Sequence, residues 1–363
     1  MTVRQPADRV RVLVALGRPA VAVLFALYTA LGLAQAGRAE DPSLLAACLV
    51  PVLAFLLFSV CVNDLSDQAI DRVNLPGDRS RPLVTAAAGA RDLVRTAVVA
   101  AAVASAAAFL LGVRPGLLML AALAVSAGYS LRPVRLADRG AVAALVLPAC
   151  YVALPYLLGL TATGSAVRPR DLLMLFGLYT GFIGRILLKD FRDVRGDALF
   201  GKRTFLVRHG RRATCLFSAC CWTLGGCLVL VTTPGAADAP VPAGAYGLCI
   251  AAVVLILRRL AGPVGHRREE ALIAGTAAIG RGLLVLQLAQ LATAQAGWSL
   301  PTRSLLLVVL LALTLGQAAS MVRYGPRTGL TLASLPPDDV ATPVATSRRS
   351  AAAGRAADGR PSA

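Results

Sequence analysis

The chain has 363 residues, of which 57% are hydrophobic and only 15% are charged. A soluble domain carries about a quarter charged residues, so this composition excludes a soluble protein and also a mostly disordered one. The formal net charge of +18 comes from 37 basic and 19 acidic residues. In so apolar a chain, this excess is typical of the cytoplasmic loops of a membrane protein. We therefore expect the lipid bilayer as a partner and no nucleic acid.

Ten apolar runs follow one another along the chain, separated by short segments rich in Gly, Pro and Arg. A bilayer crossing needs about 20 mostly apolar residues, and an unalternating run in lipid has to be a helix to satisfy its backbone. We therefore predict an all-α integral membrane protein. The predicted spans are residues 19–36, 43–62, 93–113, 116–131, 140–160, 171–188, 213–233, 244–257, 271–294 and 304–322.

The positions of the basic residues predict the orientation and the domains. With the N-terminus in the cytoplasm, most Arg and Lys residues face the cytoplasm, as expected for inner loops. Residues 1–18 form a cytoplasmic N-terminal segment, 19–322 a transmembrane domain, and 325–363 a disordered cytoplasmic tail. Arg greatly outnumbers Lys, and Ala, Gly and Pro are frequent, which suggests a GC-rich bacterial genome. We therefore expect the plasma membrane.

Six of the 19 acidic residues fall in two short segments, and both segments read D-x-x-D-x-x-x-D. On a helix, this spacing places three carboxylates along one face. Three like charges repel one another, so the pattern indicates a bound cation. Carboxylates with no His or Cys nearby favour Mg²⁺, which completes its shell with substrate phosphate oxygens. The predicted metal ligands are Asn63, Asp64, Asp67, Asp71, Asp190, Asp193 and Asp197.

Basic residues flank both acidic segments. Arg72, Arg79 and Arg81 follow the first. The second is flanked by Arg185, Lys189, Lys202 and Arg203, and a helix would place Arg185 and Lys189 on one face. Such groups bind phosphate oxygens and stabilise a departing diphosphate. Together the two segments predict a site that holds one diphosphate.

These segments resemble the UbiA superfamily of intramembrane prenyltransferases. Residues 63–83 resemble its N-D-x-x-D-x-x-x-D signature, and residues 189–205 resemble the K-D-x-x-D-x-x-G-D stretch of the homogentisate, chlorophyll and geranylgeranylglyceryl-phosphate branch. Residues 129–136 are similar to the family's tyrosine loop, although Arg132 replaces its first proline, and Arg18-Pro19 matches the Arg-Pro that opens the first span. The resemblance implies a bundle of nine transmembrane helices, to which the run 304–322 adds a tenth.

The resemblance also implies an activity: Mg²⁺-dependent transfer of an isoprenyl group from a prenyl diphosphate to a lipophilic, aromatic acceptor, with release of diphosphate. The six aspartates would hold Mg²⁺, with the active site facing the cytoplasm. Tyr129 would act as a catalytic residue, through its ring face or its hydroxyl. The predicted substrate-binding residues are Asn63, Arg72, Arg135, Arg185, Lys189, Arg18 and Lys202.

Three alternatives remain open from the sequence. A terpene cyclase on the same scaffold would use a prenyl diphosphate without an acceptor. A transporter could use the acids as an ion path, although such acids usually lie near the middle of the bilayer. Tyr129 could also be an aromatic residue of the membrane interface. The sequence does not identify the acceptor or the length of the prenyl chain.

Overall fold

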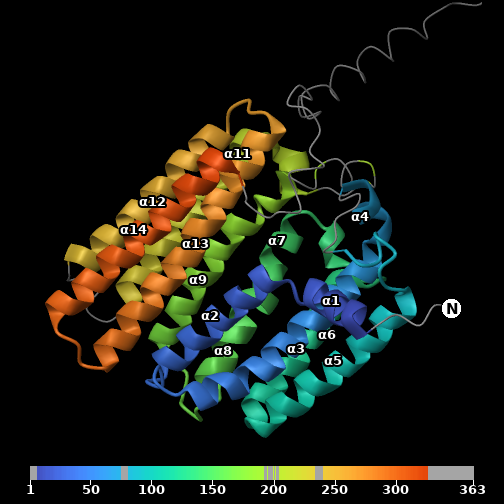
Figure 1. Cartoon of the computed structure of the whole chain (residues 1–363), viewed down its shortest axis with the longest axis horizontal. Coiled ribbons are helices and arrows are strands. Elements are labelled where there is room, and N and C mark those ends of the chain that lie inside the picture. The colour runs from blue at the N-terminus through green and yellow to red at the C-terminus, as the bar shows by residue number, and fades with distance from the viewer. Residues whose placement is uncertain are drawn as a thin grey trace, which may run out of the picture.

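The structure is a computed structural model, and it describes residues 6–74, 81–191, 194, 199, 201, 204–233 and 240–325. Over these residues the chain folds into helices and turns, without a strand (Figure 1). The helices are α1 (Pro6–Gly17), α2 (Pro19–Gln35), α3 (Pro42–Ser66), α4 (Gln68–Asn74), α5 (Ala90–Leu110), α6 (Val113–Ser130), α7 (Ala141–Pro148), α8 (Leu154–Thr161), α9 (Pro169–Ile186), α11 (Phe205–Thr232), α12 (Pro240–Leu260), α13 (His266–Gln295) and α14 (Leu300–Tyr324). The all-α prediction is confirmed.

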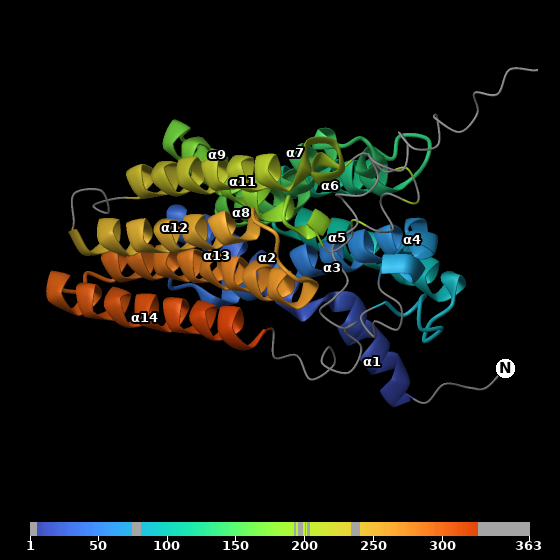
Figure 2. The same ribbon diagram turned by 90° about the horizontal axis from the view of Figure 1, so that it is seen from above.

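The predicted membrane spans each coincide with a helix or a continuous helical segment. Nine segments of the described chain are long and apolar enough to cross a membrane, and the shorter apolar α2 has 17 residues. The C-terminal α14 corresponds to the predicted tenth span. It lies on an outer face of the bundle beside α13 (Figure 2).

Two hydrophobic clusters hold the bundle together. One lies in the N-terminal half around α3 and α5, and the other lies in the C-terminal half among α9, α11, α12 and α13. The two halves meet along α2 and α8, which supply side chains to both clusters (Figure 1). Large apolar side chains also remain exposed on the outer faces, for example Leu110 at 89% and Leu305 at 66%. Such faces are suited to contact with lipid.

Two glycines, one on each helix, allow α2 and α8 to lie close together. A Cβ atom on Gly32 would overlap the carbonyl oxygen of Tyr156, and one on Gly159 would overlap the carbonyl oxygen of Thr29. Small residues of this kind allow the backbones of membrane helices to approach closely. The position of α2 against α8 is therefore fixed by backbone contact.

The span between Ala141 and Thr161 is a helix with an irregular centre. A π-helical turn at Ala149–Ala153 separates α7 from α8 and directly follows Pro148. Proline removes a backbone donor, which loosens the helix at this point, and π-turns inside helices are frequent at functional sites. This turn carries Tyr151, which lines the pocket described next.

Candidate active site

An open pocket of about 1020 Å³ lies where α3, α4, α6, α7 and α9 approach one another. Residues from distant parts of the sequence line it. Among the predicted site residues, the pocket is lined by Arg18, Asn63, Asp67, Asp71, Tyr129, Lys189 and Asp190. The structure therefore brings the two acidic segments and the tyrosine loop to one place.

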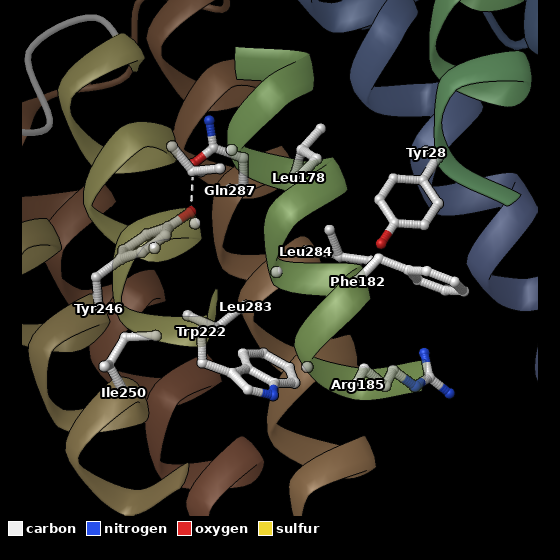
Figure 3. A pocket seen from close by; sticks show the side chains of 16 residues that line it. Tyr28, Leu178, Phe182, Arg185, Trp222, Tyr246, Ile250, Leu283, Leu284 and Gln287 are labelled. Carbon is white, nitrogen blue, oxygen red and sulfur yellow. Dashed lines mark hydrogen bonds between the residues drawn. The ribbon is translucent and has the colours of Figure 1, made fainter. Parts of the chain in front are cut away.

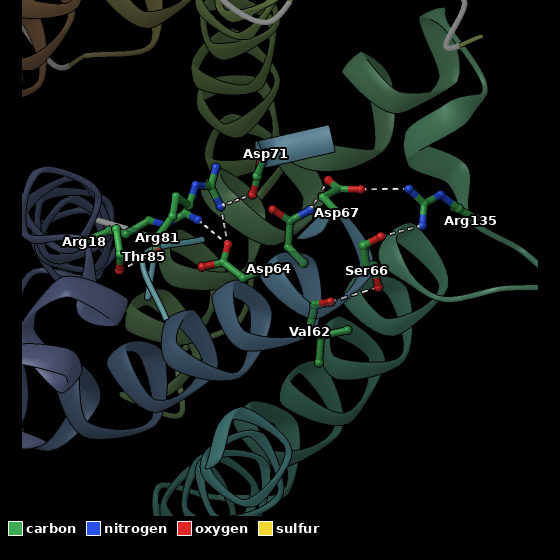
Figure 4. A network of polar contacts seen from close by, with 10 residues as sticks. Arg18, Val62, Asp64, Ser66, Asp67, Asp71, Arg81, Thr85 and Arg135 are labelled. Carbon is green, nitrogen blue, oxygen red and sulfur yellow. Dashed lines mark hydrogen bonds and ion pairs between the residues drawn. The ribbon is translucent and has the colours of Figure 1, made fainter. Parts of the chain in front are cut away.

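Asp64 pairs with two arginines that line this pocket, Arg18 and Arg81 (Figure 4). Its side chain is only 2% exposed, and its Oδ1 accepts from Arg18 Nη2 at 2.6 Å and from Arg81 Nη1. Arg81 also pairs with Asp71 Oδ2 at 3.1 Å. The other oxygen of Asp64, Oδ2, is buried and has no hydrogen-bond partner. Burial raises the pKa of the Asp71 carboxyl, against the opposing charge of Arg81.

Asp67 faces a different arginine. Arg135 Nη2 donates to Asp67 Oδ1 at 2.7 Å, while Asn63 Nδ2 donates to Asp67 Oδ2 at 3.0 Å. Arg135 is held by further contacts with the carbonyl of Ser66 at 3.1 Å and with Asp138 at 2.6 Å. Asp67 points to a different arginine from Asp64 and Asp71 because it lies at the break between two helices, since α3 ends at Ser66 and α4 begins at Gln68. The expected single stripe of three acids is therefore divided.

Two of the pairing arginines occupy unusual backbone positions. Arg18 has φ 42° and Arg135 has φ 34°, both in the left-handed region. A residue other than glycine costs roughly 1–2 kcal/mol in this region, and such strain is concentrated at functional sites. In both cases the turn directs a guanidinium group toward an acid of the first segment.

The remaining predicted residues have different positions. Arg72 is exposed on α4 and does not line the pocket. Arg185 lines a second pocket together with Tyr28, because α9 ends at Ile186 and a turn follows before Lys189. The prediction that Arg185 and Lys189 share one helix face is therefore wrong. Asp193, Asp197 and Lys202 lie outside the described residues.

Within the part of the chain that the structure describes, no group of three His, Cys, Asp or Glu residues is close enough to hold a metal ion. The contacts above explain this, because guanidinium groups lie between the acids. Asp64 and Asp71 are bridged by Arg81, and Asp67 is turned toward Arg135. The donor set nevertheless fits a hard divalent cation, since it contains carboxylates and a nearby amide, including a buried carboxylate oxygen without a partner.

Sequence reasoning missed two residues of the pocket, Tyr151 and Ser59. Tyr151 packs against Phe25 at a ring distance of 5.2 Å and against Phe182 at 6.0 Å. Ser59 accepts a hydrogen bond from Ser126 at 3.0 Å. Both lie inside apolar runs, where one polar atom gives no signal of its own. Pro148, three residues before Tyr151, was the available hint of irregular backbone.

Comparison with known proteins now identifies the family. Residues 22–279 match the model of the UbiA prenyltransferase family, so the chain belongs to this family of membrane-embedded prenyltransferases.

Two relatives and one solved structure are similar to the chain. The bacteriochlorophyll synthase 34 kDa chain of Chloroflexus aurantiacus is 27% identical over 165 residues, which cover 44% of this chain and 50% of that protein. Digeranylgeranylglyceryl phosphate synthase of Methanoculleus marisnigri is 32% identical over 205 residues, or 56% and 70% of the two chains. A UbiA homologue from Archaeoglobus fulgidus, bound to DMAPP and Mg²⁺, shares the fold with a TM-score of 0.51 and 16% identity, covering 86% of this chain and 99% of that one.

Proposed function

We propose that the protein catalyses the Mg²⁺-dependent transfer of an isoprenyl group from a prenyl diphosphate to a lipophilic, aromatic acceptor, with release of diphosphate. One observation carries the proposal. Acids from the end of α3 and from α4 share a pocket with Lys189, Asp190 and Tyr129, although these residues come from distant parts of the sequence. The A. fulgidus homologue, bound to DMAPP and Mg²⁺, supports a prenyl diphosphate and a divalent metal as ligands.

The acids would hold the metal. Asp64, Asp67 and Asp71 offer carboxylate oxygens, with Asn63 and Asp190 beside them, and we extend the ligand set to Asp193 and Asp197 from the spacing of the second segment. When bound, Mg²⁺ neutralises the diphosphate and makes it a better leaving group.

The arginines have a second role in this proposal. In the structure Arg18, Arg81 and Arg135 compensate the charges of the acids. With a divalent cation held by the acids, the same guanidinium groups, together with Lys189, would bind the phosphate oxygens of the substrate and stabilise the leaving diphosphate. Each arginine therefore exchanges a carboxylate for a phosphate.

The aromatic residues of the pocket are suited to stabilise the carbocation that forms from the prenyl diphosphate. As the allylic C–O bond breaks, the bonding electrons leave with the diphosphate and a carbocation remains. Tyr129 and Tyr151 line the pocket where this cation would form, and the ring face of a tyrosine stabilises positive charge. The acceptor carbon then attacks the cation and afterwards loses its proton to the released diphosphate. The apolar helices around the pocket exclude water, which would otherwise capture the cation.

The orientation of the protein follows from its charges. We place the site on the cytoplasmic side of the plasma membrane, because the loops at this end carry most of the basic residues.

A reconstituted assay tests the function. The purified protein in lipid nanodiscs is supplied with labelled prenyl diphosphates, with and without a panel of aromatic acceptors. We expect a prenylated acceptor only when acceptor and Mg²⁺ are both present, loss of activity with EDTA, and recovery with added Mg²⁺. A cyclic hydrocarbon formed from prenyl diphosphate alone would instead identify a terpene cyclase.

A further inference from the structure

A second pocket, of about 540 Å³, lies inside the bundle between α2, α9, α11, α12 and α13 (Figure 3). Most of its wall is apolar or glycine. Five polar side chains interrupt this wall. Tyr246 and Gln287 are hydrogen-bonded to each other, whereas the other three, Tyr28, Arg185 and Trp222, come from three different helices and have no acid beside them among the described residues.

Each of these three side chains is a hydrogen-bond donor whose partner is missing among the described residues. The side chain of Trp222 is 5% exposed, and its indole Nε1 is buried without a hydrogen-bond partner. Arg185 forms no ion pair with any described acid, and the hydroxyl of the buried Tyr28 has no hydrogen bond in the same part of the chain. Buried polar groups are nearly always paired, so three unpaired donors around one pocket indicate an acceptor that comes from outside the chain.

A second positively charged side chain follows the wall of the pocket. Arg281 on α13 comes directly after Gly280, which lines the pocket, and Arg281 also forms no ion pair among the described residues. The indole of Trp222 lies between these two helices. A Cβ atom added to Gly184 would lie 2.9 Å from Trp222 Cδ1, and one added to Gly280 would lie 2.7 Å from Trp222 Cη2. Gly184 directly precedes Arg185 and Gly280 directly precedes Arg281, so the indole ring packs next to the backbone positions of both arginines.

The charge of the pocket indicates the kind of ligand that it can bind. An ionised side chain within a membrane-spanning segment is costly unless it is paired, and such residues usually mark a functional site. Here Arg185 lines the pocket without an acid beside it among the described residues, and Arg281 follows Gly280 of the pocket wall. We propose that this pocket binds an anionic, lipophilic acceptor, and that Arg185 pairs with its carboxylate or phosphate while Trp222 and Tyr28 donate to the same group.

The link to the reaction rests on the proposed function. Phe182 lines the second pocket, and its ring lies 6.0 Å from that of Tyr151, which lines the acidic pocket. The two pockets are therefore neighbours separated by one aromatic pair. An acceptor anchored at Arg185 has its apolar body on the side of this pair, next to the site where the prenyl cation would form.

Tryptophan fluorescence tests binding independently of activity. The chain has two tryptophans, so Trp298→Phe leaves Trp222 as the sole reporter. This variant is placed in phosphatidylcholine nanodiscs and titrated with dodecyl phosphate or with dodecanol, which are optically silent. We expect saturable changes with dodecyl phosphate at a concentration at least about tenfold lower than with dodecanol. Arg185→Gln should abolish this preference, while Arg258→Gln, at an exposed arginine, should retain it.

Equal responses to the two probes, or an unchanged preference in Arg185→Gln, would overturn the anion site. Saturation by phosphatidylglycerol or by inorganic diphosphate with equal or higher affinity would overturn the assignment to the acceptor, because it would identify a lipid site or a second diphosphate site.

Kinetics then test the acceptor assignment. With a hydroxylated aromatic carboxylate and its methyl ester as paired acceptors, Arg185→Gln should raise KM for the acid about tenfold and leave KM for the ester and for the prenyl diphosphate unchanged. A rise in KM for the prenyl diphosphate would contradict the assignment. If no acceptor is prenylated while dodecyl phosphate still binds, the proposed function and the acceptor assignment fail, and the anion site itself stands.

Discussion

The two pockets of the molecule differ in whether their arginines are paired with acids. In the acidic pocket, Asp64, Asp67 and Asp71 each lie against an arginine, so charge is compensated within the chain. In the second pocket, Arg185 has no acidic partner among the described residues. Under the proposed function, the acids and arginines of the first pocket separate when ligands bind, whereas in the second pocket the ligand supplies the missing negative charge. The same side chain, arginine, therefore has a different effect on the ligand-free protein in each place.

The largest effect should come from Asp67→Ala in the acidic pocket. Loss of this carboxylate removes a proposed metal ligand and also leaves Arg135 with one acid fewer. We expect kcat/KM to fall on the order of 10³-fold, as when a main electrostatic contact to the leaving group is removed. Initial rates with labelled prenyl diphosphate measure it. Asp138→Asn, which alters the other acid of Arg135, is the matched control and should cost only a few-fold. Equal losses in both variants would make Arg135, and not metal binding, the cause.

A smaller effect is expected on stability from Arg81→Gln. It leaves Asp64 and Asp71 buried without their shared partner, and removal of one member of a buried ion pair costs about 3 kcal/mol. Six of the eight cysteines are buried, so a thiol-reactive dye can follow thermal unfolding. Mg²⁺ with diphosphate should restore part of the lost Tm, because cations replace the guanidinium. The exposed Arg91→Gln is the control. An unchanged Tm in Arg81→Gln would show that the ion pairs add no stability.

Gly280→Ala should disturb the second pocket alone. The added methyl group would lie 2.7 Å from Cη2 of Trp222, so the indole has to move, and overpacking of this kind costs about 1–3 kcal/mol. Trp222 emission in the Trp298→Phe background reports the displacement. Gly316→Ala on α14 has open space around its Cβ position and should leave both stability and emission unchanged. A shift of equal size in both variants would contradict the packing described here.

The smallest effect is expected from Arg185→Gln on the stability of the ligand-free protein. It tests the difference between the two pockets most directly. Since it removes a charge without a partner among the described residues, it should leave the protein equally stable or stabilise it by about 1 kcal/mol, because a membrane-embedded charge is costly. The thiol-dye Tm measures this change beside Arg81→Gln. Destabilisation as large as that of Arg81→Gln would mean that Arg185 is compensated within the protein.

Much of the architecture could be predicted from apolar run length, since each run became a helix. Spacing and motif resemblance also pointed to Asp71, Tyr129 and Asp190, which line the acidic pocket, and to Asp64, which pairs with two arginines of its wall. The predicted single stripe of three acids and the predicted shared face of Arg185 and Lys189 are wrong for the same reason. Both predictions assume an unbroken helix, whereas one helix ends before Asp67 and another ends at Ile186. Arg81 became important because the chain returns to Asp64 after α4, and such a return leaves no periodic signal.

The contact between α2 and α8 has a consequence for the size of the substrates. Arg18 at the start of α2 reaches the acidic pocket, and Tyr28 further along the same helix reaches the second one. Ten residues of helix measure about 15 Å, and the Gly32 and Gly159 contacts hold α2 in place. Helix α2 therefore fixes the distance between Arg18 in the acidic pocket and Tyr28 in the second pocket. Substitutions that shift it would alter which pairs of molecules fit together, even with every charged side chain intact.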